Sequence, residues 1–193
     1  MRKGHKYPPE ILTPAEVHAL IKACSRGSTG VRNQALIAVL WRCGLRISEA
    51  LALREVDLSG DRVQVLHGKN DRHRIVGIDP DALAYIERWI DRRRQLGING
   101  HRALFCTLEG KPLHSAYVRA LFKRLARKAG VDKRAHPHAL RHAHAVELLQ
   151  EGTPLMEIRD QLGHASLDGT AAYLNHIAPE DRVRRIAARR WSV

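Results

Sequence analysis

The sequence contains few aromatic residues, few cysteines and no long apolar run. Phe, Trp and Tyr make up 5% of its 193 residues, so we expect a core built mainly from Leu, Ile, Val and Ala. The three cysteines (Cys24, Cys43 and Cys106) lie outside any CxxC spacing, which argues against a disulfide framework or a cysteine zinc site and favours reduced, partly buried thiols. Because no apolar stretch approaches the roughly 20 residues of a membrane span and no apolar export segment opens the sequence, we expect a cytoplasmic protein.

Acidic residues are also in deficit. The 20 Asp and Glu residues face 33 Lys and Arg residues, which leaves a formal net charge of +13 with every His neutral. An excess of this size destabilises a compact state by self-repulsion unless a polyanion neutralises it. A membrane surface favours a basic helix with large apolar side chains opposite, which only the C-terminal segment with Trp191 approaches. The composition therefore favours nucleic acid over a membrane as the partner.

Most of the sequence carries helical patterns, and one short region carries a β pattern. Thr13-Pro14-Ala15-Glu16 has the form of a capping box with Pro at the first helical position. Segments 62–66 and 74–78 resemble strands around the turn residues 68–71, which predicts a β-hairpin with a basic tip. The helix predicted over 32–43 is apolar on almost every side and should be buried at the centre. The other predicted helices cover residues 14–24, 48–53, 81–95, 114–129, 138–150, 154–162, 167–173 and 179–190.

Four short motifs are built from residue types that handle phosphate. They are Gly44-Leu45-Arg46-Ile47-Ser48-Glu49, Gly68-Lys69 in the hairpin turn, Pro137-His138-Ala139-Leu140-Arg141-His142, and Leu162-Gly163-His164 followed by Tyr173. A guanidinium can bind two oxygens of one phosphate, and a second one can complete a clamp around a pentacoordinate phosphorane. A lysine can protonate a leaving alkoxide. A tyrosine can attack phosphorus if a base and positive charge assist a hydroxyl whose pKa is ordinarily about 10.

Each motif alone also has a plain structural explanation. Arg46 can cap a helix, Lys69 can be a turn lysine, and Tyr173 can be a packing residue. A separate alternative is a zinc site on the four histidines His136, His138, His142 and His144, because an i, i+4 pair shares one helix face. We rank the zinc site low because no acidic or cysteine ligand lies nearby.

Taken in order, the motifs resemble those of the tyrosine recombinase, or phage integrase, family. The resemblance extends from about Thr13 to His176. It implies a mainly α fold with a small β-hairpin or sheet, the catalytic-domain fold of DNA breaking-rejoining enzymes, over residues 12–176. A basic leader, 1–11, would precede it, and a C-terminal helix within 177–193 would dock on a neighbouring protomer. We expect no N-terminal core-binding domain in this chain.

The resemblance also implies a catalytic set. Its members are Arg46, Lys69, His138, Arg141, His164 and the nucleophile Tyr173, with Glu49 in support. In the family pattern the two arginines clamp the phosphate, and the lysine is the general acid toward the 5′ hydroxyl. The first histidine accepts a proton beside the tyrosine, the second orients the phosphate, and the tyrosine forms a 3′-phosphotyrosyl link. The implied chemistry needs no metal, ATP or other cofactor.

The expected function is therefore that of a site-specific DNA recombinase or integrase catalytic domain. The alternative is a catalytically silent DNA-binding regulator with the same fold, which the intact residue set disfavours. We expect double-stranded DNA as the partner, a homotetramer on DNA, a monomer when free, and a cytoplasmic location with the nucleoid. The residues predicted to contact DNA are Arg72, Arg74, Lys123 and Arg124.

Overall fold

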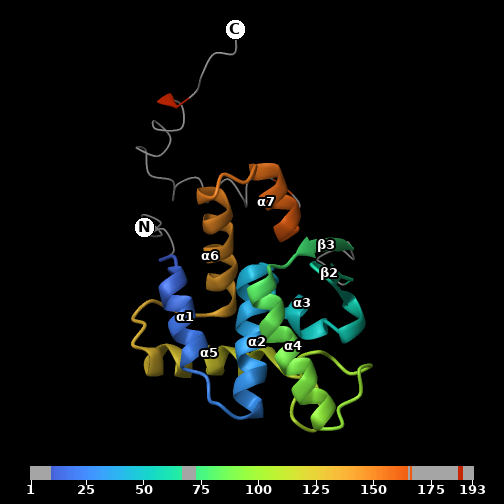
Figure 1. The fold of residues 1–193 in the computed structure, drawn as a ribbon. Helices are drawn as coiled ribbons and strands as arrows, with labels where there is room; N and C mark the ends of the chain where they lie inside the picture. Colours follow the sequence, from blue (N-terminus) through green and yellow to red (C-terminus); the bar gives the residue numbers. More distant parts are fainter. Residues whose placement is uncertain (1–9, 67–72, 165, 167–186, 189–193) are drawn as a thin grey trace, which may run out of the picture.

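The computed structural model of the chain describes residues 10–66, 73–164, 166 and 187–188. Within this part the helices are α1 (Pro14–Lys22), α2 (Ser28–Arg42), α3 (Ile47–Ala52), α4 (Pro80–Gln95), α5 (Ser115–Ala129), α6 (Pro137–Gln150) and α7 (Leu155–Leu162), with a 3-10 turn at Glu55–Asp57. The strands are β1 (Leu58–Ser59), β2 (Arg62–Val65) and β3 (Arg74–Gly77) (Figure 1). The predicted combination of many helices and a small β element is confirmed.

Local signals placed the start of α1 correctly. The Thr13 hydroxyl accepts a hydrogen bond from the Glu16 amide at 3.2 Å, and the Glu16 carboxylate accepts one from the Thr13 amide at 2.7 Å. Both bonds of a capping box are present, and Pro14 opens the helix as expected. The predicted helices over 167–173 and 179–190 fall outside the described residues, except for 187–188.

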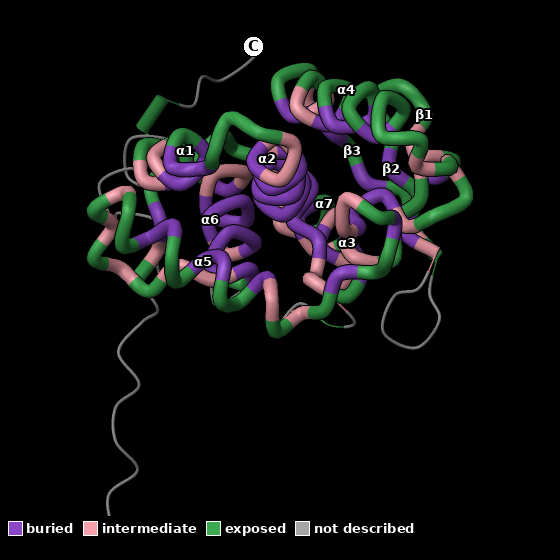
Figure 2. The backbone as a smooth tube through the Cα atoms, turned by 90° about the horizontal axis from the view of Figure 1, so that it is seen from below, coloured by how far each residue is buried: buried purple, intermediate pink, exposed green. Residues whose placement is uncertain are grey.

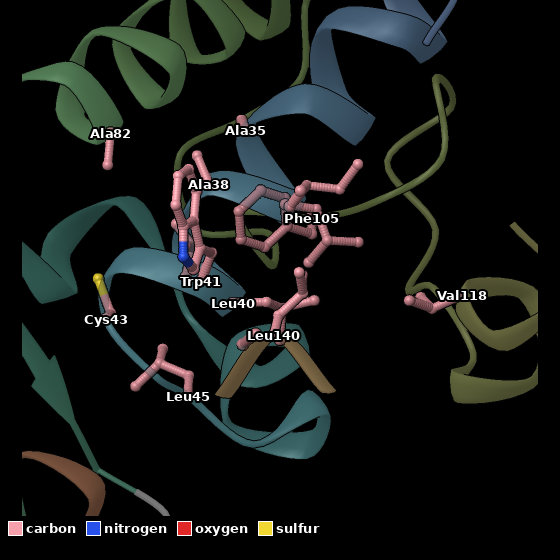
Figure 3. Packing of buried hydrophobic residues seen from close by; sticks show 14 of the residues in the cluster. Ala35, Ala38, Leu40, Trp41, Cys43, Leu45, Ala82, Phe105, Val118 and Leu140 are labelled. Atoms are coloured by element: carbon pink, nitrogen blue, oxygen red, sulfur yellow. The ribbon is translucent and has the colours of Figure 1, made fainter. Parts of the chain in front are cut away.

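Helix α2 forms the centre of the fold. Every residue from Ala35 to Trp41 is buried, which confirms the predicted central helix. Figure 2 shows α2 between α1, α5 and α6 on one side and α4 with the sheet on the other. Trp41 and Leu40 of α2 pack in the same cluster as Phe105 and Leu140 (Figure 3). The helix begins at Ser28, four residues before the predicted start at residue 32, because Gly27 serves as its N-cap.

The sheet contains one strand more than the predicted hairpin. Its antiparallel order is β1-β2-β3, with Val65 paired to Arg74 and Val63 paired to Val76. Strand β1 has only two residues, which is too short for a sequence pattern to reveal. The three valines point into the core while Ile75 is 61% exposed, so the alternation of β3 places Arg74 on the inward face.

Two expectations about individual side chains are wrong. Arg93 belongs to the run Arg92-Arg93-Arg94, whose charge predicts a polar helix face, but it is 1% exposed and donates to Glu55 and to backbone carbonyls of the 99–103 loop. The three cysteines are buried, Cys43 and Cys106 completely, rather than partly buried as expected. Among the described helices, none combines the length and apolarity needed to cross a bilayer.

Candidate active site

Arg46 stands where the chain enters α3. It occupies the N-cap position, and its side chain is 29% exposed. One terminal nitrogen, Nη1, donates to Glu49 Oε1 at 2.7 Å, and the other, Nη2, donates to the carbonyl of Gly163 at 3.0 Å. The guanidinium therefore bridges the start of α3 and the end of α7 while remaining open to solvent.

Arg141 of α6 is buried next to this bridge. Its side chain is 1% exposed and donates at 2.6 Å to the carbonyls of Gly44 and Leu162. Gly44 turns the chain with a φ of +60°, and a Cβ there would lie 2.6 Å from the ring of His144. Arg46 and Arg141 thus bind successive carbonyls at the C-terminal end of α7, where the helix dipole favours cations. The structure brings the two predicted clamp arginines to one place.

His138 lies in the first turn of α6, one turn before Arg141 on the same side of the helix. Burial lowers the pKa of His138 below its ordinary value, and the positive charges of Arg141 and Arg46 lower it further. The imidazole is therefore neutral near pH 7, which leaves it able to accept a proton.

His164 follows the left-handed Gly163 that ends α7. Burial lowers its pKa to about 4, and the charges of Arg141 and Arg46 contribute next. The influence of both arginines on both histidines indicates that the four groups share one electropositive site. A neutral imidazole there can orient an anion by hydrogen bonding without titrating near neutrality.

The carboxylate of Glu49 links two arginines of the site, Arg46 and Arg74. The residue is 3% exposed and accepts bonds from the Arg46 amide at 2.8 Å and from the Arg46 side chain. Burial raises the pKa of the Glu49 carboxyl, but hydrogen bonds from Arg74 and Arg46 outweigh this and bring the pKa below its ordinary value. The predicted supporting role of Glu49 has a clear geometric basis in these contacts.

The remaining predicted site residues divide into three groups. Lys69, Arg72 and Tyr173 lie outside the described residues. Lys123 and Arg124 are exposed on α5, as a nucleic-acid contact requires. Arg74, also predicted to contact DNA, turns inward, with its side chain 13% exposed and paired to Glu49. The sequence does contain a signal for this, because Arg74 shares its strand face with the apolar Val76.

The histidines of α6 are not arranged as the zinc alternative requires. The Nδ1 atom of His136 accepts the Ala139 amide at 3.2 Å, as a helix cap. The rings of His138 and His142 meet edge to face, 4.2 Å apart between centroids, while His144 is buried behind Gly44. In the described part of the chain, no group of three His, Cys, Asp or Glu side chains is placed to hold a metal ion.

The described site is therefore a cationic cradle: an accessible guanidinium, a buried guanidinium and two neutral imidazoles. Such a set can bind a phosphodiester, stabilise added negative charge on it and receive a proton. The reaction class that this arrangement fits is transesterification at phosphorus. The glycines that shape it, Gly44 and Gly163, appeared in the sequence motifs, but their structural reasons became visible only in the fold.

Comparison with solved structures identifies the class of protein to which this fold belongs. The fold matches the crystal structure of XerA recombinase with a TM-score of 0.81 at 25% identity, over 99% of this chain and 68% of that one. It matches XerH site-specific recombinase, bound to palindromic difH substrate in a post-cleavage complex, with a TM-score of 0.77 at 26% identity, over 97% of this chain and 55% of that one. The fold is that of tyrosine recombinase catalytic domains.

The sequence relatives identify the family. Tyrosine recombinase XerC of Lactobacillus leichmannii is 31% identical, over 94% of this chain and 65% of that protein. Tyrosine recombinase XerD of Ralstonia nicotianae is 36% identical, over 95% of this chain and 61% of that protein. The phage integrase family pattern matches residues 10–180, and the chain belongs to that family. The chain spans less than two thirds of the length of these two relatives.

Proposed function

We propose that this chain is the strand-cleaving and rejoining domain of a site-specific tyrosine recombinase. The observation that carries the proposal is the convergence of Arg46, Arg141 and His164 at the C-terminal end of α7, with His138 one turn before Arg141 on α6. Two guanidiniums and two neutral imidazoles match the charge and proton requirements of phosphodiester transesterification. The family membership supports the same function.

The proposed reaction is a balanced exchange of ester bonds. The Tyr173 hydroxyl attacks phosphorus, a bond forms between tyrosine oxygen and phosphorus, and the bond from phosphorus to the 5′ oxygen breaks. His138 receives the tyrosine proton, and Lys69 gives a proton to the departing 5′ oxygen. The 3′-phosphotyrosyl ester keeps the bond energy, so a free 5′ hydroxyl can reverse the reaction without ATP or a metal.

The arginines act on charge rather than on protons. Arg46 is exposed enough to contact the phosphate directly, while Arg141 adds positive charge from beneath. Preorganised donors of this kind stabilise the extra negative charge of the phosphorane because they need no rearrangement during the reaction. We propose double-stranded DNA as the substrate and an assembly of four protomers on DNA for strand exchange.

The test is covalent trapping in cells. The chain is expressed, cells are lysed in SDS, and DNA attached to the protein is recovered and sequenced. We expect one enriched DNA sequence from the parent chain and none from Tyr173→Phe. Tyr85→Phe is the matched control, because it removes a tyrosine hydroxyl from α4, and it should leave the adduct unchanged. An adduct that persists in Tyr173→Phe would show a different nucleophile, and no adduct from the parent chain would favour a silent DNA-binding regulator.

A further inference from the structure

Arg74 makes more side-chain contacts with the site than a peripheral DNA-contacting residue needs. Its Nη1 and Nη2 atoms donate to Glu49 Oε1 at 3.0 Å and Glu49 Oε2 at 2.9 Å, in a two-pronged pair. Its Nε atom donates to the carbonyl of Gln161 at 3.2 Å. All three nitrogens of the guanidinium therefore have protein partners, and its charge is matched by a buried carboxylate.

Glu49 connects Arg74 to the phosphate-facing side of the site. Its carboxylate accepts two bonds from Arg74 and two from Arg46, one of them from the Arg46 backbone amide. A buried carboxylate needs this degree of compensation, because desolvation favours its neutral form. Loss of Arg74 would remove the two-pronged pair that fixes the Glu49 carboxylate, so Arg46 would be held by a less firmly positioned partner.

Arg74 also contacts the turn that carries His164. A Cβ added to Gly163 would lie 2.8 Å from the guanidinium carbon of Arg74, so the side chain packs directly against this turn. The carbonyl of the same glycine accepts the bond from Arg46. Nearby, the Gln161 side chain exchanges two hydrogen bonds of 3.2 Å with the Gly77 backbone, which fastens β3 to α7.

We propose that Arg74 is a positioning residue of the cleavage site, acting through Glu49 on Arg46 and through the Gly163 turn on His164, and not a DNA contact. The inference rests on the proposed function for the reaction that Arg74 serves. It assigns to Arg74 the task of joining three elements: β3, the start of α3 and the end of α7. A displacement of the clamp by about 1 Å is enough to lower a rate up to 100-fold.

Three measurements on the full chain separate positioning from DNA contact. The first is the amount of SDS-stable DNA adduct per cell. The second is the affinity for a duplex of unrelated sequence over a series of salt concentrations. The third is the pH titration of the Glu49 carboxyl, followed by carbon-13 NMR on glutamate-labelled protein and assigned with Glu49→Gln. The variants are Arg74→Met, Arg74→Lys and the control Arg62→Met, which removes an exposed arginine from the neighbouring strand.

For Arg74→Met we expect about a tenfold or greater loss of adduct, with duplex affinity within about twofold and an unchanged salt slope. The Glu49 titration should move to higher pH, because burial is then opposed by one arginine instead of two. Arg74→Lys should give an adduct yield and a Glu49 pKa that lie between those of the parent and those of Arg74→Met. Combining Arg74→Met with Glu49→Gln should cost less adduct than the product of the two separate losses, because the part of the Arg74 effect that acts through Glu49 is then lost only once. Arg62→Met should leave the adduct and the Glu49 titration as in the parent.

Other results would overturn the inference. A salt slope reduced by about 1, with adduct restored at saturating DNA, would make Arg74 a phosphate contact. A Glu49 pKa that is the same in Arg74→Met as in the parent would also contradict the inference. Circular dichroism must first show that each variant is folded. If Arg74→Met does not fold, Arg74→Lys decides by the same criteria. If the parent chain gives no adduct, the proposed function fails, but the Glu49 titration and the salt slope still decide the role of Arg74.

Discussion

The imidazole of His144 lies behind the site in an unusual setting. It is 4% exposed, and neither ring nitrogen has a hydrogen-bond partner among the described residues. Burial lowers its pKa to about 3, and the charges of Arg42 and Arg141 act in the same direction. A buried neutral histidine of this kind links the folding of the site to pH, because the unfolded chain binds a proton that the folded chain rejects.

The sign of this linkage predicts destabilisation in acid. The contribution of His144 to stability is complete above its unfolded pKa of about 6.5, and it is lost as the pH falls from there toward about 3. Between pH 7.5 and pH 5 we expect the parent to lose about 2 kcal/mol more unfolding free energy than His144→Leu. Urea denaturation at both pH values measures the difference.

His101→Leu serves as the control, because it removes an exposed histidine from the same chain. The comparison between His144→Leu and the parent cancels the effects of the other histidines, because both chains contain them. Equal losses of unfolding free energy in the parent and in His144→Leu would show that this imidazole is protonated, or accessible to water, in the folded state.

At the scale of elements, the two glycines that end α5 and α7 provide a natural comparison. Gly130 and Gly163 both adopt a φ of +65° as C-caps, but a Cβ on Gly130 would meet nothing within 4 Å. A Cβ on Gly163 would press against the Arg74 guanidinium, which its pair with Glu49 prevents from moving freely. The same chemical change therefore has different consequences at the two helix ends.

We expect Gly130→Ala and Gly163→Ala each to lose about 1 kcal/mol of unfolding free energy, from the left-handed backbone alone. Only Gly163→Ala should lower the yield of covalent DNA adduct, because only there is Arg74 displaced. Urea unfolding and SDS trapping of both variants provide the two readouts. A comparable fall in adduct for both variants would attribute the effect to stability and not to the site.

The same elements show what local sequence signals can and cannot predict. The Thr13 capping box and the apolar α2 are local features that were found where the sequence placed them, and α5 and α7 end at the predicted residues 129 and 162. The start of α2 was missed because a glycine N-cap in a polar stretch looks like a turn. Local patterns therefore define element types better than their ends.

The orientation of charged side chains was the harder part. Arg93 was expected to face solvent and Arg74 to face DNA, yet both are directed inward by partners distant in sequence. For Arg74 the strand alternation with Val76 indicates the inward direction, but it does not reveal the partner, Glu49, which lies 25 positions away. The motifs predicted which residues of the described site lie together. The structural reasons for Gly44 and Gly163, and the buried ion pairs, became visible only in the folded structure.

For the whole molecule, the formal net charge of +13 means that Lys and Arg side chains outnumber the carboxylates available to pair with them. Glu49 pairs with Arg46 and Arg74, and Glu55 pairs with two arginines of α4. Lys123 and Arg124, in contrast, are exposed. The pattern suits a surface that binds a polyanion by releasing its counterions.

This arrangement predicts strongly salt-dependent binding of duplex DNA. If the chain neutralises about 6 phosphates, a plot of log K against log salt concentration should have a slope of about −5, measured by fluorescence anisotropy on an unrelated duplex. Replacing Lys123 and Arg124 with Gln should make the slope shallower by about 2, because each lost phosphate contact removes about 1. An unchanged slope would remove these two residues from the interface. A slope near zero for the parent chain would contradict binding of the DNA backbone by this charged surface, whatever the chemistry of the active site.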